Sequence, residues 1–174
     1  MNRYLLLLLI LAIAHISASP TIRPYDCANV PPMCYRLIGS KYTKMRLPNM
    51  LNHTRYEDVA ADIKVWRPLL NSSICNAANQ LKYFLCFTYA PVCVDKLISP
   101  CKSLCETVRD SCDPVMRQYN YSWPAFFNCN QPKKFHDDSS QMCINLKMLG
   151  IGKCSCKGSY TKKTLKALIC KSDF

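Results

Sequence analysis

Histidine is rare in this sequence, and its scarcity limits the chemistry that the chain can perform. The chain has three histidines among its 174 residues. Only His53 and His136 follow residue 19, and both lie in polar surroundings far apart in the sequence. No Cys–His or Ser–His–Asp arrangement is indicated, so nucleophilic catalysis has no support. The sequence therefore predicts that the protein is not an enzyme.

Glycine is scarce as well, with four residues in the chain. The strongest enzyme alternative is a secreted, disulfide-rich phospholipase, which requires a Gly-rich calcium loop and a His-Asp pair on a cysteine-bearing helix. The corresponding segment here, Cys101–Asp110, contains no histidine. Internal repeats and low-complexity segments are also absent. This class of enzyme is therefore not expected.

Long apolar runs are absent except near the N-terminus. There, Arg3 precedes an unbroken apolar run, Leu5–Ala14, and the small residues Ser17-Ala18-Ser19 precede Pro20. This is the anatomy of a secretory signal peptide, and the run is shorter than the roughly 18 to 20 residues that span a bilayer. We therefore expect residues 1–19 to be a signal peptide, no transmembrane segment, and a secreted, extracellular product.

Acidic residues are outnumbered by basic ones, 11 against 23, for a net charge of +12. Residues 145–174 hold seven lysines and one aspartate, a net of +6, whereas residues 20–144 hold 15 basic and 10 acidic residues, a net of +5. Outside the cell, a basic surface favours sulfated glycans or anionic lipid over nucleic acid. Heparan sulfate is therefore a candidate partner and nucleic acid is not; the alternative is a solvated basic tail.

Cysteine is the abundant residue, with 13 in the chain, all after residue 19. In an oxidising compartment these thiols are expected to form disulfides. For the same reason, Cys101-x3-Cys105 and Cys154-x-Cys156 are not expected to bind zinc, and we predict neither a metal nor a cofactor. Three N-x-S/T sequons fit an exported glycoprotein; their asparagines are Asn52, Asn71 and Asn120.

Apolar spacing predicts a mainly helical domain. A capping box over Thr54–Glu57 opens a helix whose apolar residues recur as far as Trp66, and Pro68 ends it. A second helix is expected over about residues 74–88. The β-branched and aromatic residues of 34–47 predict one or two short strands.

The third predicted helix carries several cysteines. Ser99 is its expected N-cap and Pro100 its first residue, and a short helix is expected to restart at Asp113-Pro114 and run to about Tyr119. One helical stripe holds Cys101, Cys105 and Cys112. Sulfurs on one face cannot pair with one another, so these three must form disulfides with other segments.

The ordered motifs of residues 27–143 resemble the Frizzled cysteine-rich domain. Ten cysteines occur in the family's order, each with neighbours that are characteristic of the family. In chain order, these segments are Cys27-x6-Cys34, Leu47-Pro48-Asn49, Trp66-Arg67-Pro68-Leu69, Cys75, Tyr83–Cys93, Ser99–Glu106, Cys112, Met116–Tyr119, Trp123-Pro124, Cys129 and Cys143. The resemblance implies a small, disulfide-rich, mostly α-helical domain over residues 20–146, with two short β-strands and five disulfides.

Spacing alone does not choose among the many possible pairings of ten cysteines. The resemblance implies five pairs: Cys27–Cys93, Cys34–Cys86, Cys75–Cys112, Cys101–Cys143 and Cys105–Cys129.

The resemblance also implies the ligand. Such domains bind Wnt proteins, partly by taking the ligand's unsaturated acyl chain into a groove between helices. The residues at the groove positions are Trp66, Pro68, Leu69, Leu70, Tyr119, Tyr121 and Ile144. A second contact surface on the Cys86–Cys93 loop comprises Thr88, Val92 and Val94. Burying about ten methylenes at roughly 0.8 kcal/mol each would give about 8 kcal/mol, enough to anchor a ligand.

The end of the chain resembles the opening of the netrin-like domain of secreted Frizzled-related proteins, through Cys154-Ser155-Cys156 and Leu168–Phe174. We expect residues 147–174 to be a basic linker and the truncated start of such a domain. The odd number of cysteines there, with Cys170, predicts poor order and an intermolecular or mixed disulfide.

These observations predict a secreted Frizzled-related protein, as a fragment or short form, that antagonises Wnt signalling by sequestering the acylated ligand. Frizzled receptors are a further candidate partner. One alternative is a shed or partial ectodomain of a Frizzled-like receptor or matrix protein. A less favoured one is an accessory domain of a secreted enzyme.

Overall fold

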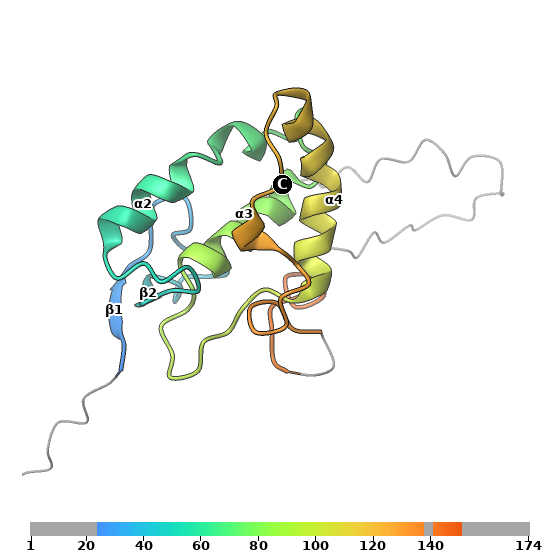
Figure 1. Cartoon of the computed structure of the whole chain (residues 1–174). Coiled ribbons are helices and arrows are strands. Elements are labelled where there is room, and N and C mark those ends of the chain that lie inside the picture. Colours follow the sequence, from blue (N-terminus) through green and yellow to red (C-terminus); the bar gives the residue numbers. More distant parts are fainter. Residues whose placement is uncertain (1–23, 138–140, 151–174) are drawn as a thin grey trace, which may run out of the picture.

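Three α-helices and one two-stranded sheet form the described part of the chain (Figure 1). The structure is a computed structural model that describes residues 24–137 and 141–150. The expected signal peptide, residues 1–19, lies outside these ranges, and so do residues 151–174 of the expected linker and netrin-like segment, 147–174. The elements are β1 (Asp26–Asn29), β2 (Lys44–Leu47), α2 (Tyr56–Lys64), the 3-10 turn η1 (Arg67–Leu70), α3 (Ala78–Tyr89), α4 (Lys102–Gln118) and the 3-10 turn η2 (Ala125–Phe127).

Helix α3 is the centre of the fold and lies between α2 and α4 (Figure 1). It is apolar on most of its circumference, which is the pattern of a helix enclosed by other elements. Phe84, near its middle, is fully buried, and its ring lies 5.0 Å from the ring of Phe127 and 5.6 Å from that of Phe135. Aromatic packing therefore joins α3 to the segments that follow α4.

The predicted first helix exists, but its ends differ from the prediction. Arg55, not Thr54, is the N-cap of α2, and no side chain caps the helix. Glu57 forms an ion pair with Arg55 at 3.4 Å, so the expected capping box is wrong. The α-helix ends at Lys64, and Pro68 lies within η1, where an early proline is tolerated because it needs no N–H partner.

Helix α4 begins later than predicted. Its N-cap is Cys101, because the residues before it pair with a later segment instead of starting the helix. The Ile144 N–H donates to the Ser99 carbonyl at 2.8 Å, and the Cys101 N–H donates to the Ile144 carbonyl at 2.9 Å. Ser99 is therefore part of an extended bridge, and its prediction as an N-cap is wrong.

Helix α4 also continues through the position at which a restart was predicted. It runs without a break past Pro114 to Gln118. The proline removes one backbone donor. Contacts on both sides of it hold the helix in place, since Cys112 is buried and Met116 packs against the core.

The two short strands that the resemblance implies are present, and one of them lies in the segment where strands were expected. Strand β2 lies within the predicted 34–47 segment and buries Met45 and Leu47. Strand β1 pairs with it antiparallel, with Asp26 opposite Leu47. Strand β1 is exposed over most of its length, so it lacks the apolar alternation that identifies a strand in a sequence.

Five disulfides hold these elements together, and they are the pairs that the resemblance implies: Cys27–Cys93, Cys34–Cys86, Cys75–Cys112, Cys101–Cys143 and Cys105–Cys129. The three cysteines at or within α4 all pair with other segments. No helix among the described residues is long and apolar enough to cross a membrane.

Candidate functional site

The chain leaves α4 through a tight turn that exposes two tyrosines. Asn120 has a left-handed backbone, with φ of 62°. Its N–H donates to the Arg117 carbonyl, and the Tyr121 N–H donates to the Met116 carbonyl, both at 3.0 Å. This pair of bonds around a left-handed residue is a Schellman motif, a common helix end. Tyr119 and Tyr121 flank it, and each is 69 % exposed.

Trp123 joins this turn to η1. Its ring lies 5.8 Å from the ring of Trp66, the residue that precedes η1, in an edge-on arrangement. The Trp123 indole N–H donates to the Phe127 carbonyl at 2.8 Å, and its backbone N–H donates to Asp113 Oδ1 at 2.9 Å. The hydrogen bond from Arg117 to Asp113 is the main cause that lowers the pKa of this carboxyl.

Trp123 packs against Trp66 beside η1, and Tyr119 and Tyr121 come four and two residues before Trp123, so we take the exposed side chains here as one candidate surface. We call this surface the aromatic face; it is formed by Leu69, Leu70, Tyr119, Tyr121 and Trp123. The two leucines belong to η1, and they and Trp123 are half-buried against the core. Phe126 of η2, which packs on Phe127, is also 45 % exposed. Exposed apolar groups gathered in one place indicate a binding surface.

Trp66 forms the floor of this surface. It is 7 % exposed, and its indole N–H donates to the Tyr89 hydroxyl at 3.2 Å. Burial raises the pKa of Tyr89 to about 12, so the hydroxyl stays protonated at neutral pH. Trp66 therefore packs against Trp123 of the aromatic face from the core side. Pro68, another predicted groove residue, is exposed on η1.

Ile144 does not lie on the aromatic face, which corrects its assignment to the groove. Its backbone pairs with Ser99 and Cys101 at the N-terminal end of α4, whereas Tyr119 and Tyr121 follow the C-terminal end. A 17-residue helix is about 25 Å long at 1.5 Å per residue. The structure therefore separates Ile144 from Tyr119 and Tyr121 by the length of α4.

The predicted second surface is the loop that follows α3. Val94 is 37 % exposed, and Val92 is half-buried and bridges to Met45 of β2. Thr88 is fully buried, and its hydroxyl donates to the Phe84 carbonyl within α3 at 2.7 Å. Thr88 therefore cannot contact a ligand at the surface, which corrects that assignment.

Arg46 holds this loop, a role that the sequence did not indicate. Its Nη1 donates to the carbonyls of Val94, at 3.2 Å, and Asp95, at 2.6 Å. Its guanidinium lies 4.4 Å from the centre of the Tyr25 ring, within the range of a cation–π contact. The Tyr25 hydroxyl donates to Asp95 Oδ1 at 2.5 Å. Arg46 and the loop are far apart in sequence, so no local pattern could have revealed the contact.

Comparison with known families decides what kind of domain carries these surfaces. Residues 27–136, more than half of the chain, match the family model described as "Fz domain". The chain belongs to the Fz domain family.

The Fz domain of this chain is similar to that of several curated proteins. Secreted frizzled-related protein 1 of Homo sapiens is 41 % identical over 109 residues, which are 63 % of this chain and 34 % of that protein. Secreted frizzled-related protein 5 of Bos taurus is 40 % identical over 125 residues, 70 % of this chain and 36 % of that protein. Secreted frizzled-related protein 2 of Gallus gallus is 34 % identical over 159 residues, which are 84 % of this chain and 52 % of that protein. The chain thus spans between about a third and half of these relatives.

Among solved structures, the Fz domain is similar to the selenomethionine-labelled Smoothened CRD. The TM-score is 0.49 at 24 % identity, and the match covers 64 % of this chain and 93 % of that one.

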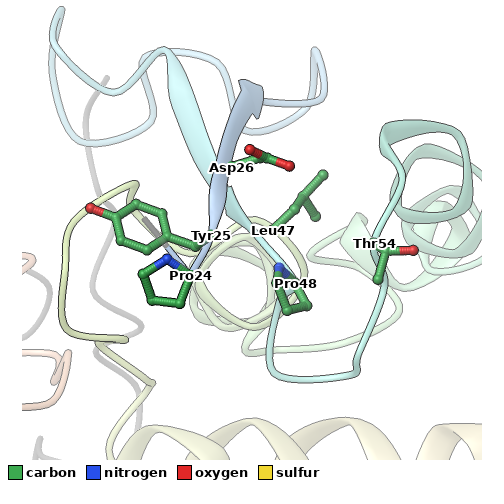
Figure 2. Close-up of a pocket in the computed structure, with 6 residues that line it drawn as sticks. All are labelled: Pro24, Tyr25, Asp26, Leu47, Pro48 and Thr54. Atoms are coloured by element: carbon green, nitrogen blue, oxygen red, sulfur yellow. The ribbon is translucent and has the colours of Figure 1, made fainter. Parts of the chain in front are cut away.

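The Fz domain has an open pocket of about 190 Å³ near the sheet (Figure 2). Its lining residues are Pro24, Tyr25, Asp26, Leu47, Pro48 and Thr54. Figure 2 shows Thr54 on the side opposite to Tyr25. None of the predicted groove residues lines this pocket, so it is separate from the aromatic face.

His53 of the Fz domain has a structural role. Its Nε2 lies 3.0 Å from Asp62 of α2, its Nδ1 lies 3.0 Å from the Asn49 amide, and its ring stacks on Tyr89 at 5.8 Å. These contacts connect the loop before α2 to the last turn of α2 and to the end of α3. Within residues 24–137 and 141–150, no three His, Cys, Asp or Glu side chains gather to hold a metal ion.

Proposed function

We propose that this Fz-domain protein is secreted, is not an enzyme, and antagonises Wnt signalling by taking the ligand's acyl chain on the aromatic face. The observation that carries the proposal is the pair of tyrosines, each 69 % exposed, at the Schellman end of α4, close in the chain to Trp123, which packs against Trp66. The names of its relatives, secreted frizzled-related proteins, support secretion and the pathway.

The chemistry of the aromatic face suits an acyl chain. Tyrosine rings offer flat apolar area, and each keeps a hydroxyl that can face water at the rim. Each methylene removed from water contributes about 0.8 kcal/mol, so even partial cover of a long chain gives several kcal/mol. Leu69 and Leu70 add aliphatic surface beside the rings. A long apolar chain is therefore a better match to this surface than a charged ligand.

The loop around Val94 is proposed as the second contact, made with the protein part of the ligand. Arg46, Tyr25 and the Cys27–Cys93 disulfide hold its shape before any ligand arrives. A loop that is already ordered loses less conformational entropy on binding. Pre-organisation of this kind supports a role in recognition.

A charge placed on the aromatic face tests the proposal. We expect Tyr121→Glu to weaken binding to acylated Wnt by about a hundredfold, because an unpaired carboxylate would be covered by the acyl chain. Tyr35→Glu is the matched control, since Tyr35 is also exposed, at 49 %, but lies in the loop before β2. Binding would be measured by surface plasmon resonance on variants whose circular dichroism spectra match the wild type.

Two outcomes would contradict the proposal. Tyr121→Glu could bind acylated Wnt as tightly as the wild type, or Tyr35→Glu could weaken binding equally. A ligand that lacks the acyl chain should bind the wild type more weakly, and its affinity should fall little further with Tyr121→Glu. Additive losses would place the acyl chain elsewhere on the protein.

A further inference from the structure

Asn120 lies between the two tyrosines of the aromatic face and begins a sequon, Asn120-Tyr121-Ser122. It is the left-handed residue of the Schellman motif that ends α4. Asparagine adopts this conformation more readily than most residues, and here its side chain is at the surface. The motif therefore fixes the backbone from which the Asn120 carboxamide projects.

One of the three sequon asparagines, Asn71, is hydrogen-bonded through its carboxamide. Asn52, like Asn120, has a left-handed backbone and no such bond among the described residues. The Asn71 carboxamide oxygen accepts hydrogen bonds from the Ser73 N–H, at 3.0 Å, and from the Ser73 hydroxyl, at 2.8 Å. Asn52 lies in the loop before α2, at the opposite end of that helix from Trp66. No residue in the described ranges hydrogen-bonds to the Asn120 carboxamide, which is therefore available for modification.

We infer that Asn120 carries an N-linked glycan and that this glycan covers the aromatic face, so that its presence controls access of the acyl chain. The inference rests on the proposed function. In the modification step, a lipid-linked oligosaccharyl diphosphate is the donor. A bond forms between the Asn120 Nδ2 and the anomeric carbon of the sugar, the bond from that carbon to the diphosphate breaks, and the proton lost from Nδ2 leaves with the lipid diphosphate.

The position of Asn120 makes cover of the face the expected result. A sugar attached at Nδ2 starts between Tyr119 and Tyr121, whose rings are large exposed partners. The C–H faces of a sugar ring pack on aromatic rings, while its hydroxyls stay in water. A bulky hydrophilic glycan held there would have to move before an apolar chain could reach the rings. The cost of moving it lowers the affinity for the acyl chain.

Variants that remove this glycan in two different ways test the inference. Ser122→Ala destroys the sequon and leaves Asn120 in place. Asn120→Gly removes the acceptor but keeps a residue that favours a positive φ, so the helix end is preserved. Ser122→Thr keeps the sequon. Thr54→Ala is the matched control, because it removes the Asn52 sequon at a distance from the aromatic face.

The full chain would be secreted from mammalian cells, and glycan occupancy would be read by mass spectrometry. Affinity for acylated and deacylated Wnt would be measured for each variant. We expect Ser122→Ala and Asn120→Gly to lose one glycan and to bind acylated Wnt about tenfold or more tightly than the wild type. Ser122→Thr should match the wild type, and Thr54→Ala should lose a glycan without a change in affinity.

An unmodified Asn120 in the secreted wild type, or equal affinity with and without its glycan, would overturn the inference while leaving the proposed function in place. If no variant distinguished acylated from deacylated Wnt, the proposed function would fail and the inference with it.

Discussion

Asn49 makes most of the hydrogen bonds that fix the loop between β2 and α2. The side chain is 4 % exposed. Its oxygen accepts from the N–H groups of Leu51, at 2.9 Å, and His53, at 3.0 Å. Its amide nitrogen donates to the Tyr89 carbonyl at 2.7 Å. One buried carboxamide therefore connects the loop to α3.

Replacement of Asn49 by alanine should lower the free energy of unfolding by about 3 kcal/mol, because buried donors and acceptors lose their partner. Urea denaturation of the oxidised protein would measure the change. Asn128→Ala is the control: the Asn128 oxygen accepts one hydrogen bond, from Asn130 at the surface, and its loss should cost less than about 1 kcal/mol. Equal losses for the two variants would contradict the role given to Asn49.

Arg117 donates a hydrogen bond to Asp113, whose other partner is the backbone N–H of Trp123. The hydrogen bond from Arg117 lowers the pKa of Asp113, and the Trp123 N–H adds to the effect. We expect Arg117→Met to raise this pKa towards the ordinary value of 3.8, measured by NMR titration of the carboxyl. Arg109→Met should raise it less, because Arg109 contributes least of these groups. A lowered carboxyl pKa stabilises the folded protein at pH values above the ordinary pKa of the group. That stabilisation is lost as the pH falls through the pKa of the folded state.

Arg46 of β2 joins the sheet to the loop after α3. We expect Arg46→Gln to speed amide exchange at Val94 about tenfold, because the loop loses a cation–π contact and a charged donor. Hydrogen exchange followed by NMR would measure it. Arg36→Gln is the matched control, since Arg36 also lies over a tyrosine, Tyr35, but belongs to another loop. Unchanged exchange at Val94 in the Arg46 variant would show that the disulfide alone holds the loop.

The ends of the helices show what local sequence signals could and could not predict. The apolar spacing of α2, α3 and α4 was sufficient to place all three. Their start signals were less reliable: Thr54 and Ser99 are both suitable N-caps, yet neither acts as one. Glu57 pairs with Arg55, and Ser99 pairs with Ile144, which is distant in sequence. A tertiary contact of that kind has no local signature.

The same limit applies to the candidate site. The resemblance placed Trp66, Tyr119 and Tyr121 in one groove. The structure packs Trp66 against Trp123 and exposes both tyrosines, and the groove itself stays a prediction. It also included Ile144, which the bridge to Ser99 holds at the other end of α4. Trp123 was part of the recognised motif, but its contact with Trp66 depends on folding of the whole segment. Burial of Thr88 likewise follows from the enclosure of α3 by its neighbours.

For the whole molecule, the positive charge near the end of the chain predicts attachment to heparan sulfate. Residues 145–174 carry seven lysines against one aspartate. We expect replacement of Lys162, Lys163 and Lys166 by glutamine to shift elution from heparin to lower salt, because fewer cations bind the sulfates and salt screens their attraction. Replacement of Lys41, Lys44 and Lys96, three exposed lysines of the Fz domain, is the control. If replacement of Lys162, Lys163 and Lys166 left the elution position unchanged, the charge of residues 145–174 would serve solubility only.

The order of the five disulfides has a consequence for cleavage of the chain. Two of them, Cys27–Cys93 and Cys34–Cys86, join residues before position 94, and two others, Cys101–Cys143 and Cys105–Cys129, join residues after position 100. Of the five, only Cys75–Cys112 crosses between these groups. One proteolytic cut after the exposed Lys96 would therefore turn the described domain into a two-chain molecule with a single covalent link, and reduction of that bond would leave only noncovalent packing to hold the halves together.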